Sequence, residues 1–131
     1  MGKRQTFLNE LPTGIRSPLT KLFDAGCQLD LSPGSWSIPA TGTVADMTKT
    51  LFILATDVDI TGFTPQYIGQ ICIIYCIDST ADATVTTGAG VTFDGTNDVA
   101  TFDATGDCII VIAYTMTRWL VLVNNGTIAF S

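Results

Sequence analysis

Four short runs of apolar residues constrain this sequence more than any other feature. They are Leu51–Ala55 (LFILA), Ile71–Ile77 (ICIIYCI), Cys108–Tyr114 (CIIVIAY) and Trp119–Val123 (WLVLV). Each is rich in the β-branched and aromatic residues that favour strands. Because neighbouring positions are apolar alike, each strand is expected to be buried on both faces, either between two sheets or between a sheet and a neighbouring subunit.

Turn residues separate these runs at regular intervals. They occur at Ser32–Gly34, Thr41–Gly42, Thr61–Gly62, Gly88–Gly90, Asp94–Gly95, Thr105–Asp107 and Asn125–Gly126. Between them, Ala83–Thr86 and Val91–Phe93 alternate apolar and polar residues, as half-exposed strands do. About seven to nine strands at intervals of roughly 8–12 residues predict an all-β fold, either an antiparallel β-sandwich or a barrel.

Two hairpins are predicted near the C-terminal end. Thr115–Arg118 joins the third and fourth apolar runs and has the usual length of a hairpin connection. Asn125-Gly126 lies between Val121–Val123 and Ile128–Phe130. Since Asn-Gly is the strongest short hairpin signal, a second hairpin is expected there.

The first 28 residues differ in kind from the rest. Their large apolar residues are Phe7, Leu8, Leu11, Ile15, Leu19, Leu22 and Phe23. Pro12, Gly14 and Pro18 break any continuous helix, although residues 18–25 have the capping signals of a short one. The sequence therefore predicts an extended N-terminal docking arm over residues 1–28 and a β-sandwich domain over residues 29–131. Its own body, a sister subunit and another protein remain open as the surface on which the arm docks.

Charge is divided unevenly along the chain. Residues 1–21 hold Lys3, Arg4, Arg16 and Lys21 against Glu10, a net charge of +3. The remaining 110 residues hold two cations against eleven aspartates, a net charge of −9, and the two parts sum to −6. Because phosphate binding needs clustered Lys and Arg, no direct nucleic-acid partner is expected.

Neither a secretory signal nor a membrane helix is expected. Polar residues and prolines interrupt the segment after Lys3 and Arg4, and no stretch reaches the roughly 18 uncharged apolar residues of a membrane helix. We therefore expect a protein made and kept soluble inside a cell, with no membrane partner.

In a cell interior, reduced and buried thiols are expected at Cys27, Cys72, Cys76 and Cys108. Their spacing lacks the paired cysteines of a zinc knuckle.

The sequence offers little for catalysis. Histidine is absent, which removes the commonest general base and metal ligand. Asp94–Asp98 (DGTND) is superficially like a calcium loop, but residues 29–131 hold no glutamate to complete an EF-hand, and Asp, Asn and Gly are what tight turns use. The sequence therefore predicts no enzyme, no cofactor and no metal site.

Two aromatic positions are candidate interface residues. A guanidinium beside an indole, as in Arg118-Trp119, is typical of interface hot spots, and Trp36 raises the same possibility. The favoured alternative is that Trp119 begins a buried strand while Arg118 faces solvent or pairs with an aspartate.

Short motifs are spread over residues 66–131. They are Ile68–Gln70 (IGQ), Ala83–Thr86 (ATVT), Gly90–Phe93 (GVTF), Asp94–Asp98 (DGTND), Thr105–Asp107 (TGD) and Thr117–Trp119 (TRW). In this order the motifs resemble the small β-domains of tailed-bacteriophage structural proteins, which recur in capsid decoration (cement) proteins and in head or tail fibres. The resemblance implies a jelly-roll-like or related β-sandwich, usually a homotrimer, without catalytic residues. Since the chain has no long repetitive shaft, the decoration role is favoured over a fibre.

The expected function is therefore that of a virion structural protein, assembled in the host cytoplasm, that decorates the capsid exterior and stabilises the head. Its expected partner is the major capsid protein. The predicted capsid-binding residues of the arm are Phe7, Leu8, Leu11, Ile15, Leu19 and Phe23 in apolar grooves and Lys3, Arg4, Arg16 and Lys21 on acidic capsid surface. The alternative is a glycan- or receptor-binding tip domain of a phage fibre, in which Trp36, Tyr67 or Trp119 would stack on a sugar.

Overall fold

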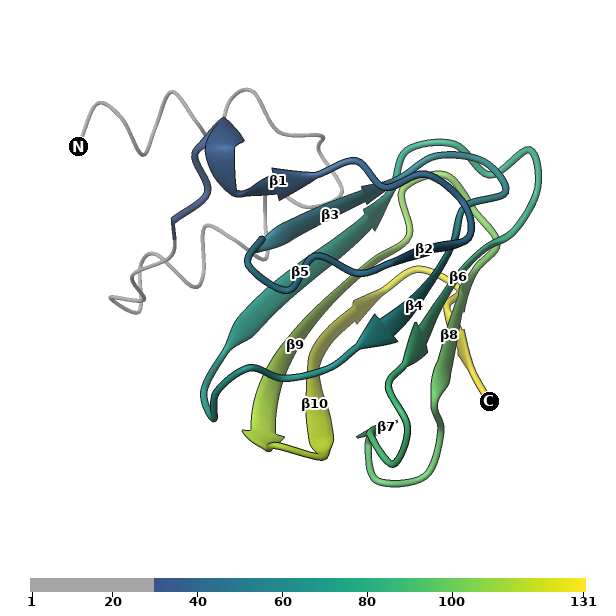
Figure 1. Cartoon of the computed structure of the whole chain (residues 1–131). Helices are drawn as coiled ribbons and strands as arrows, with labels where there is room; N and C mark the ends of the chain where they lie inside the picture. Colours follow the sequence, from purple (N-terminus) through teal and green to yellow (C-terminus); the bar gives the residue numbers. More distant parts are fainter. Residues whose placement is uncertain (1–29) are drawn as a thin grey trace.

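A computed structural model describes residues 30–131, which form eleven strands and one short 3₁₀ helix (Figure 1). The helix η1 is Pro33–Ser35, and the strands are β1 (Trp36–Ser37), β2 (Thr43–Val44), β3 (Leu51–Leu54), β4 (Asp59–Phe63), β5 (Ile71–Cys76), β6 (Ala83–Thr87), β7 (Thr92–Phe93), β8 (Val99–Phe102), β9 (Cys108–Thr115), β10 (Arg118–Asn125) and β11 (Ala129–Phe130). The predicted arm, its short helix and Cys27 lie outside the described residues. Within residues 30–131, no helix is long and apolar enough to cross a membrane.

The strands form two packed sheets, which confirms the predicted β-sandwich. The six-stranded sheet has the order β1-β3-β5-β9-β10-β7, and the five-stranded sheet has the order β11-β8-β6-β4-β2. Both sheets are mixed rather than wholly antiparallel: β3 runs parallel to β1 and β5, and β4 runs parallel to β2 and β6. The chain alternates between the sheets from β3 to β6 (Figure 1), so each return to a sheet brings the new strand in the same direction as the last.

An aromatic group fills the centre of the main core between the sheets. The Phe63 ring lies 5.3 Å from that of Phe52, 6.1 Å from that of Phe93 and 4.8 Å from that of Trp119. Trp119 is fully buried, and its Nε1–H donates to the Phe63 carbonyl at 3.2 Å. This bond joins the two layers and satisfies the one polar atom of the indole in an apolar core.

The other face of the six-stranded sheet is apolar as well. Residues that alternate with those of the main core form a second buried cluster: Leu51 of β3, Ile73 and Tyr75 of β5, Cys108 and Ile110 of β9, and Leu31. This outer cluster confirms that the apolar runs are buried on both faces. It also explains why they do not alternate with polar residues, since each face of these strands is covered.

The three described cysteines are free and buried. Cys72 and Cys76 point into the main core, whereas Cys108 belongs to the outer cluster. Burial raises the pKa of both Cys72 and Cys108 to about 12. Because the thiolate is the reactive form, both side chains act as small apolar residues in the folded protein.

One of the two predicted hairpins is confirmed and the other is wrong. β9 and β10 pair antiparallel across Met116 and Thr117. After Asn125-Gly126, however, the chain crosses to the five-stranded sheet, where β11 pairs with β8. The Asn-Gly turn therefore connects two sheets and not two neighbouring strands.

A buried carboxylate holds this crossover in place. Asp107 is 2% exposed, and its Oδ2 accepts from the backbone N–H groups of Asp103 and Ala104 at 3.2 and 3.0 Å. Its Oδ1 accepts from the Thr127 N–H at 3.0 Å. Gly126 packs against the same carboxylate so closely that a Cβ there would lie 2.0 Å from Oδ1. The β8–β9 turn thus fixes the β10–β11 connection, which overrides the local hairpin preference.

We predict that Asp107→Asn destabilises the protein by about 1–3 kcal/mol, because the new NH₂ group would face N–H donors in a buried site. The measurement is chemical denaturation monitored by tryptophan fluorescence. The control is Asp82→Asn, at an exposed position in the β5–β6 loop. Equal stability of the two variants would show that the Asp107 bonds do not stabilise the crossover.

Candidate interaction surface

Four large apolar side chains are exposed together at one end of the six-stranded sheet. Tyr67 and Ile68 of the β4–β5 loop are 60% and 66% exposed, and Tyr114 at the end of β9 and Met116 of the β9–β10 turn are 58% and 45% exposed. We refer to these four residues as the apolar end. The β4–β5 loop and the end of β9 meet there, because the Gly69 N–H donates to the Ala113 carbonyl at 2.8 Å.

Hydrogen bonds hold the β4–β5 loop in one conformation. Gln70 is buried, and its side chain accepts from the Gln66 N–H at 2.8 Å and donates to the Met47 carbonyl at 3.0 Å. Gly69 adopts a φ of +88°, which a side chain would disfavour, and brings the chain alongside β9. Tyr67 and Ile68 therefore project from a fixed backbone, so little conformational entropy is lost when a partner binds them.

Arg118 lies at the side of the apolar end. Its guanidinium carbon is 6.0 Å from the centroid of the Tyr114 ring, and its Nη2 donates to the Asp94 carbonyl at 3.1 Å. Its buried Nε has no hydrogen-bond partner among the described residues. The sequence predicted that Arg118 faces solvent or pairs with an aspartate. Instead, Arg118 is half-buried, and its side chain bonds to the backbone carbonyl of Asp94 and not to a carboxylate.

The apolar surface continues from this end along the outer face of the six-stranded sheet. Leu120 of β10 lies opposite Ile112 of β9, which in turn lies opposite Ile71 of β5. All three are half-buried, and Leu122 is exposed. Beyond them the face becomes fully buried in the outer cluster. One apolar surface therefore runs from solvent at the apolar end to complete burial near Leu31.

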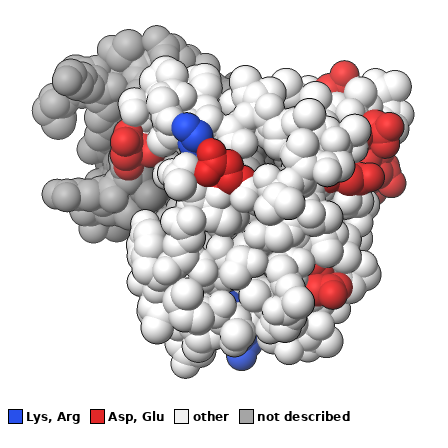
Figure 2. Space-filling model, viewed as in Figure 1, with Lys and Arg blue, Asp and Glu red and all other residues white. Residues whose placement is uncertain are grey.

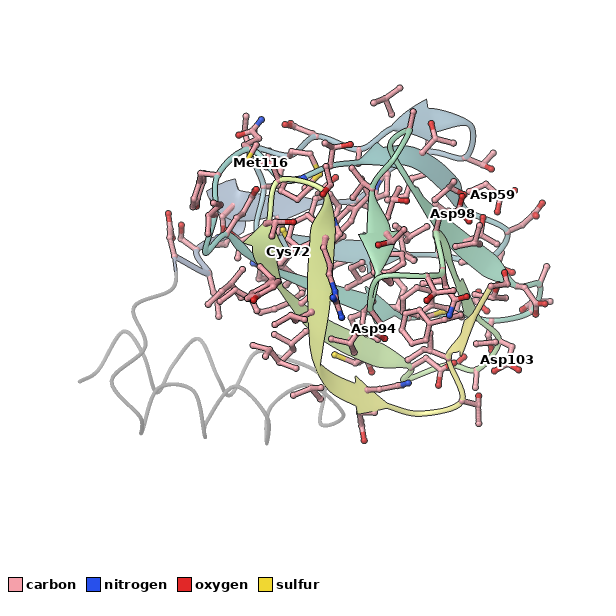
Figure 3. All side chains as sticks on the ribbon, turned by 90° about the horizontal axis from the view of Figure 1, so that it is seen from below. Asp59, Cys72, Asp94, Asp98, Asp103 and Met116 are labelled. Atoms are coloured by element: carbon pink, nitrogen blue, oxygen red, sulfur yellow. The ribbon has the colours of Figure 1, made fainter. Side chains whose placement is uncertain are left out.

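Acidic side chains gather at the opposite end of the sandwich. Asp57, Asp78, Asp82 and Asp103 are exposed in the β3–β4, β5–β6 and β8–β9 loops, and we refer to them as the acidic end. Figure 2 shows red carboxylates gathered at the upper right and a largely uncharged surface below. Figure 3 places Met116 and Asp103, a member of the acidic end, on opposite sides of the view. The two ends therefore present different chemistry to a partner.

The structure brings some of the predicted interface residues together and separates others. Arg118 lies beside the apolar end. Trp119 is fully buried at the start of β10, as the favoured alternative predicted. Its indole is therefore not exposed for contact with a partner. Trp36 is half-buried against the outer cluster, and its Nε1–H donates to the Leu31 carbonyl at 3.0 Å. The arm residues Lys3, Arg4, Phe7, Leu8, Leu11, Ile15, Arg16, Leu19, Lys21 and Phe23 lie outside the described residues.

Sequence reasoning missed most of the apolar end. It considered Tyr67 only as a stacking residue, and it did not single out Ile68, Tyr114 or Met116 as surface residues. The available signal was the position of these residues next to a turn or a glycine, where strands leave the core. Sequence alone does not show which of two apolar neighbours at a strand end points outward.

Several aspartates bond to turn and strand groups in the part of the chain that the structure describes. No group of three or more acidic or cysteine ligands there is arranged to hold a metal ion. In the Asp94–Asp98 turn, the Asp94 side chain accepts from the Val121 N–H at 3.3 Å. The Asp59 carboxylate accepts from the Thr84 hydroxyl at 2.6 Å. These bonds fit the predicted role of the aspartates in tight turns and strand contacts.

No known family model matches this chain, and no curated protein matches it either. The apolar end and its surroundings therefore provide the basis for a functional proposal.

We predict that Gly95→Ala destabilises the protein and displaces Arg118. Gly95 has a φ of +89°, and an added Cβ would lie 3.0 Å from the Arg118 guanidinium carbon. Strain in the left-handed region and the contact together should cost about 1–3 kcal/mol. Thermal unfolding measures the effect, and Gly34→Ala is the control, since a Cβ at Gly34 meets nothing within 4 Å. Equal unfolding temperatures of the two variants would show that the Gly95 turn accepts a side chain without strain.

Proposed function

We propose that this protein is a capsid decoration protein, a virion structural protein without catalytic activity that binds the outside of the major capsid lattice as a homotrimer. The observation that supports the proposal is the apolar end: Tyr67, Ile68, Tyr114 and Met116 are exposed together. Exposed apolar groups of this kind mark interaction sites. Aromatic residues, Met and Arg are also the residue types enriched at protein interfaces.

The two ends of the sandwich favour one orientation on a capsid. The apolar end would face the lattice, where its side chains lose their contact with water, and the acidic end would face solvent. A negatively charged outer surface keeps decorated particles soluble and apart. Three copies of the apolar end in a trimer would engage three lattice sites at once, so modest single contacts add up to firm attachment.

The basic residues of the N-terminal segment fit the same role. Lys3, Arg4, Arg16 and Lys21 would meet acidic capsid surface, as expected from the sequence. Such contacts steer association and fix the register of binding more than they add affinity.

A glycan- or receptor-binding fibre tip is the second candidate, favoured by two exposed tyrosines. Tyr67 and Tyr114 project from segments joined by the Gly69–Ala113 hydrogen bond. Exposed aromatic rings suit stacking on a sugar face. Trp119 does not serve this purpose, because it is fully buried.

Co-sedimentation with bare heads of the phage that encodes the chain tests the proposal. The full chain is expected to sediment as a trimer on its own and to pellet with heads. The variant Tyr67→Ser/Ile68→Ser should lose at least about tenfold in affinity, since it removes two anchor residues, with an unchanged melting temperature because both side chains are already exposed. The control is Ile38→Ser, at a side chain that is 71% exposed away from the apolar end.

Equal binding by the apolar-end variant and the control would reject the apolar end as the attachment surface. A stable trimer that ignores heads but binds a glycan array through Tyr67 would replace the decoration role with the fibre-tip role.

A further inference from the structure

The Arg118 side chain is held in place by contacts within the described chain. Its Nη2 donates to the Asp94 carbonyl at 3.1 Å, and its guanidinium carbon lies 6.0 Å from the centroid of the Tyr114 ring. Gly95 makes room for the guanidinium, since a Cβ built there would lie 3.0 Å from the guanidinium carbon. The side chain is therefore fixed before a partner binds, so binding costs little further side-chain entropy.

The positive charge of Arg118 has no carboxylate partner within residues 30–131. Its hydrogen bond goes to a neutral carbonyl, while the Asp94 carboxylate accepts from the Val121 N–H at 3.3 Å. The Nε is buried without a hydrogen-bond partner among these residues, and a Cβ at Gly95 would lie 3.2 Å from it. Nη1 makes no hydrogen bond to a described residue, and the half-buried side chain stays within reach of a partner. One donor of a fixed cation is thus available to an outside acceptor.

Arg118 is an exception on an acidic body. Residues 30–131 hold ten aspartates against two cations, a net charge of −8. The other cation, Lys49, donates from Nζ to the Gly34 carbonyl beside β1, at the opposite edge of the six-stranded sheet from β7 and β10. The apolar end is therefore the place where a cation adjoins exposed apolar side chains. Beside apolar groups, an ion pair is screened less than in bulk water.

We propose that Arg118 binds a carboxylate of the partner, so that the apolar end recognises an acidic protein segment: an Asp or Glu side chain flanked by apolar side chains. The flanking residues of that segment would cover Tyr67, Ile68 and Met116, and its carboxylate would accept from Nη1 of Arg118. The inference rests on the proposed function for the location of the segment, which is the outside of the capsid lattice, and it adds the chemistry of the segment.

The charge of the body favours a single carboxylate over a polyanion. A nucleic acid or an anionic membrane presents many negative charges, and a body with a net charge of −8 repels them. One carboxylate in an apolar segment meets the one cation at this end and little else that is charged. Such a pair fixes the register in which the apolar side chains meet.

Two peptides test this chemistry without heads. Ac-Leu-Glu-Leu-NH₂ or Ac-Leu-Gln-Leu-NH₂ is titrated into the isotope-labelled full chain, and NMR follows the signals of the Arg118 Nε–H and the Gly95 amide. At equal concentration the glutamate peptide should shift both signals at least about threefold more than the glutamine peptide, because hydrogen bonds to a charged acceptor are the stronger ones. Equal shifts would overturn the inference, whether or not the protein binds heads.

Binding to bare heads tests the same ion pair on the proposed partner. Arg118→Gln should bind at least about tenfold more weakly than the control Lys49→Gln, since both variants remove one positive charge but only one removes it beside the apolar end. Arg118→Lys should fall between Arg118→Gln and the unaltered chain, because it keeps the charge and loses the planar donor group. Equal affinities of Arg118→Gln and Lys49→Gln would count against the inference.

Heads without surface carboxylates separate an ion pair from a structural role of Arg118. Their carboxylates are converted to amides with glycinamide and a water-soluble carbodiimide. On these heads Arg118→Gln and the unaltered chain should bind alike, because the group that distinguishes them is gone. A defect of the same size on native and amidated heads would overturn the inference, since a disturbed Asp94–Gly95 turn would weaken both equally.

The two proposals fail in different ways. If the unaltered chain ignores heads, the proposed function is rejected, and the peptide titration still decides whether Arg118 binds a carboxylate. If the unaltered chain binds heads but the Arg118 variants match the control, only the inference is rejected. Arg118-dependent binding of glycans that carry a sugar acid, over the same glycans without it, would assign the carboxylate to a sugar and overturn the assignment to a protein segment.

Discussion

The structure depends on one sheet that is apolar on both faces. Its central strands, β3, β5 and β9, hold large apolar side chains at successive positions, so each face needs a cover. The five-stranded sheet covers one face through the aromatic group around Phe63 and Trp119. On the outer face, Leu31 and Trp36 pack with side chains of β3, β5 and β9 in the outer cluster. The architecture follows from the free-energy cost of leaving either face in water.

Different interactions hold the loops at the two ends of the sandwich. At the acidic end, the loops are tied together by polar groups, most of all by the Asp107 carboxylate and its backbone donors. At the apolar end, backbone bonds around Gly69 and Gln70 fix the loop while Tyr67 and Ile68 remain in solvent. Hydrogen bonds therefore maintain an exposed apolar surface that hydrophobic burial alone would remove. Such a surface suits attachment to a larger assembly.

Strand positions and the double burial of the apolar runs were predictable from the sequence, because both follow from local side-chain pattern. The β9–β10 hairpin was predictable too, since its strands are adjacent and its connection is short. The mixed sheets were not, because β3 and β5 become parallel neighbours only through the crossing to β4 in the other sheet. The Asn125-Gly126 prediction was wrong because Asp107, about twenty residues earlier, fixes the chain at Thr127 by a long-range bond.

The sequence by itself predicted an all-β chain with buried thiols and turns built from aspartate, asparagine and glycine, and it favoured a buried tryptophan at the start of β10. Only the tertiary structure decided which apolar residues stay exposed. Tyr114 and Ala113 are neighbours in one apolar run, yet the first is exposed and the second is buried. The same holds for the two faces of β5, where the choice between main core and outer cluster depends on which strands pair beside it. The exposure of a side chain depends on strand pairing and on contacts between layers, which join residues far apart in the chain. The local residue pattern does not specify these contacts.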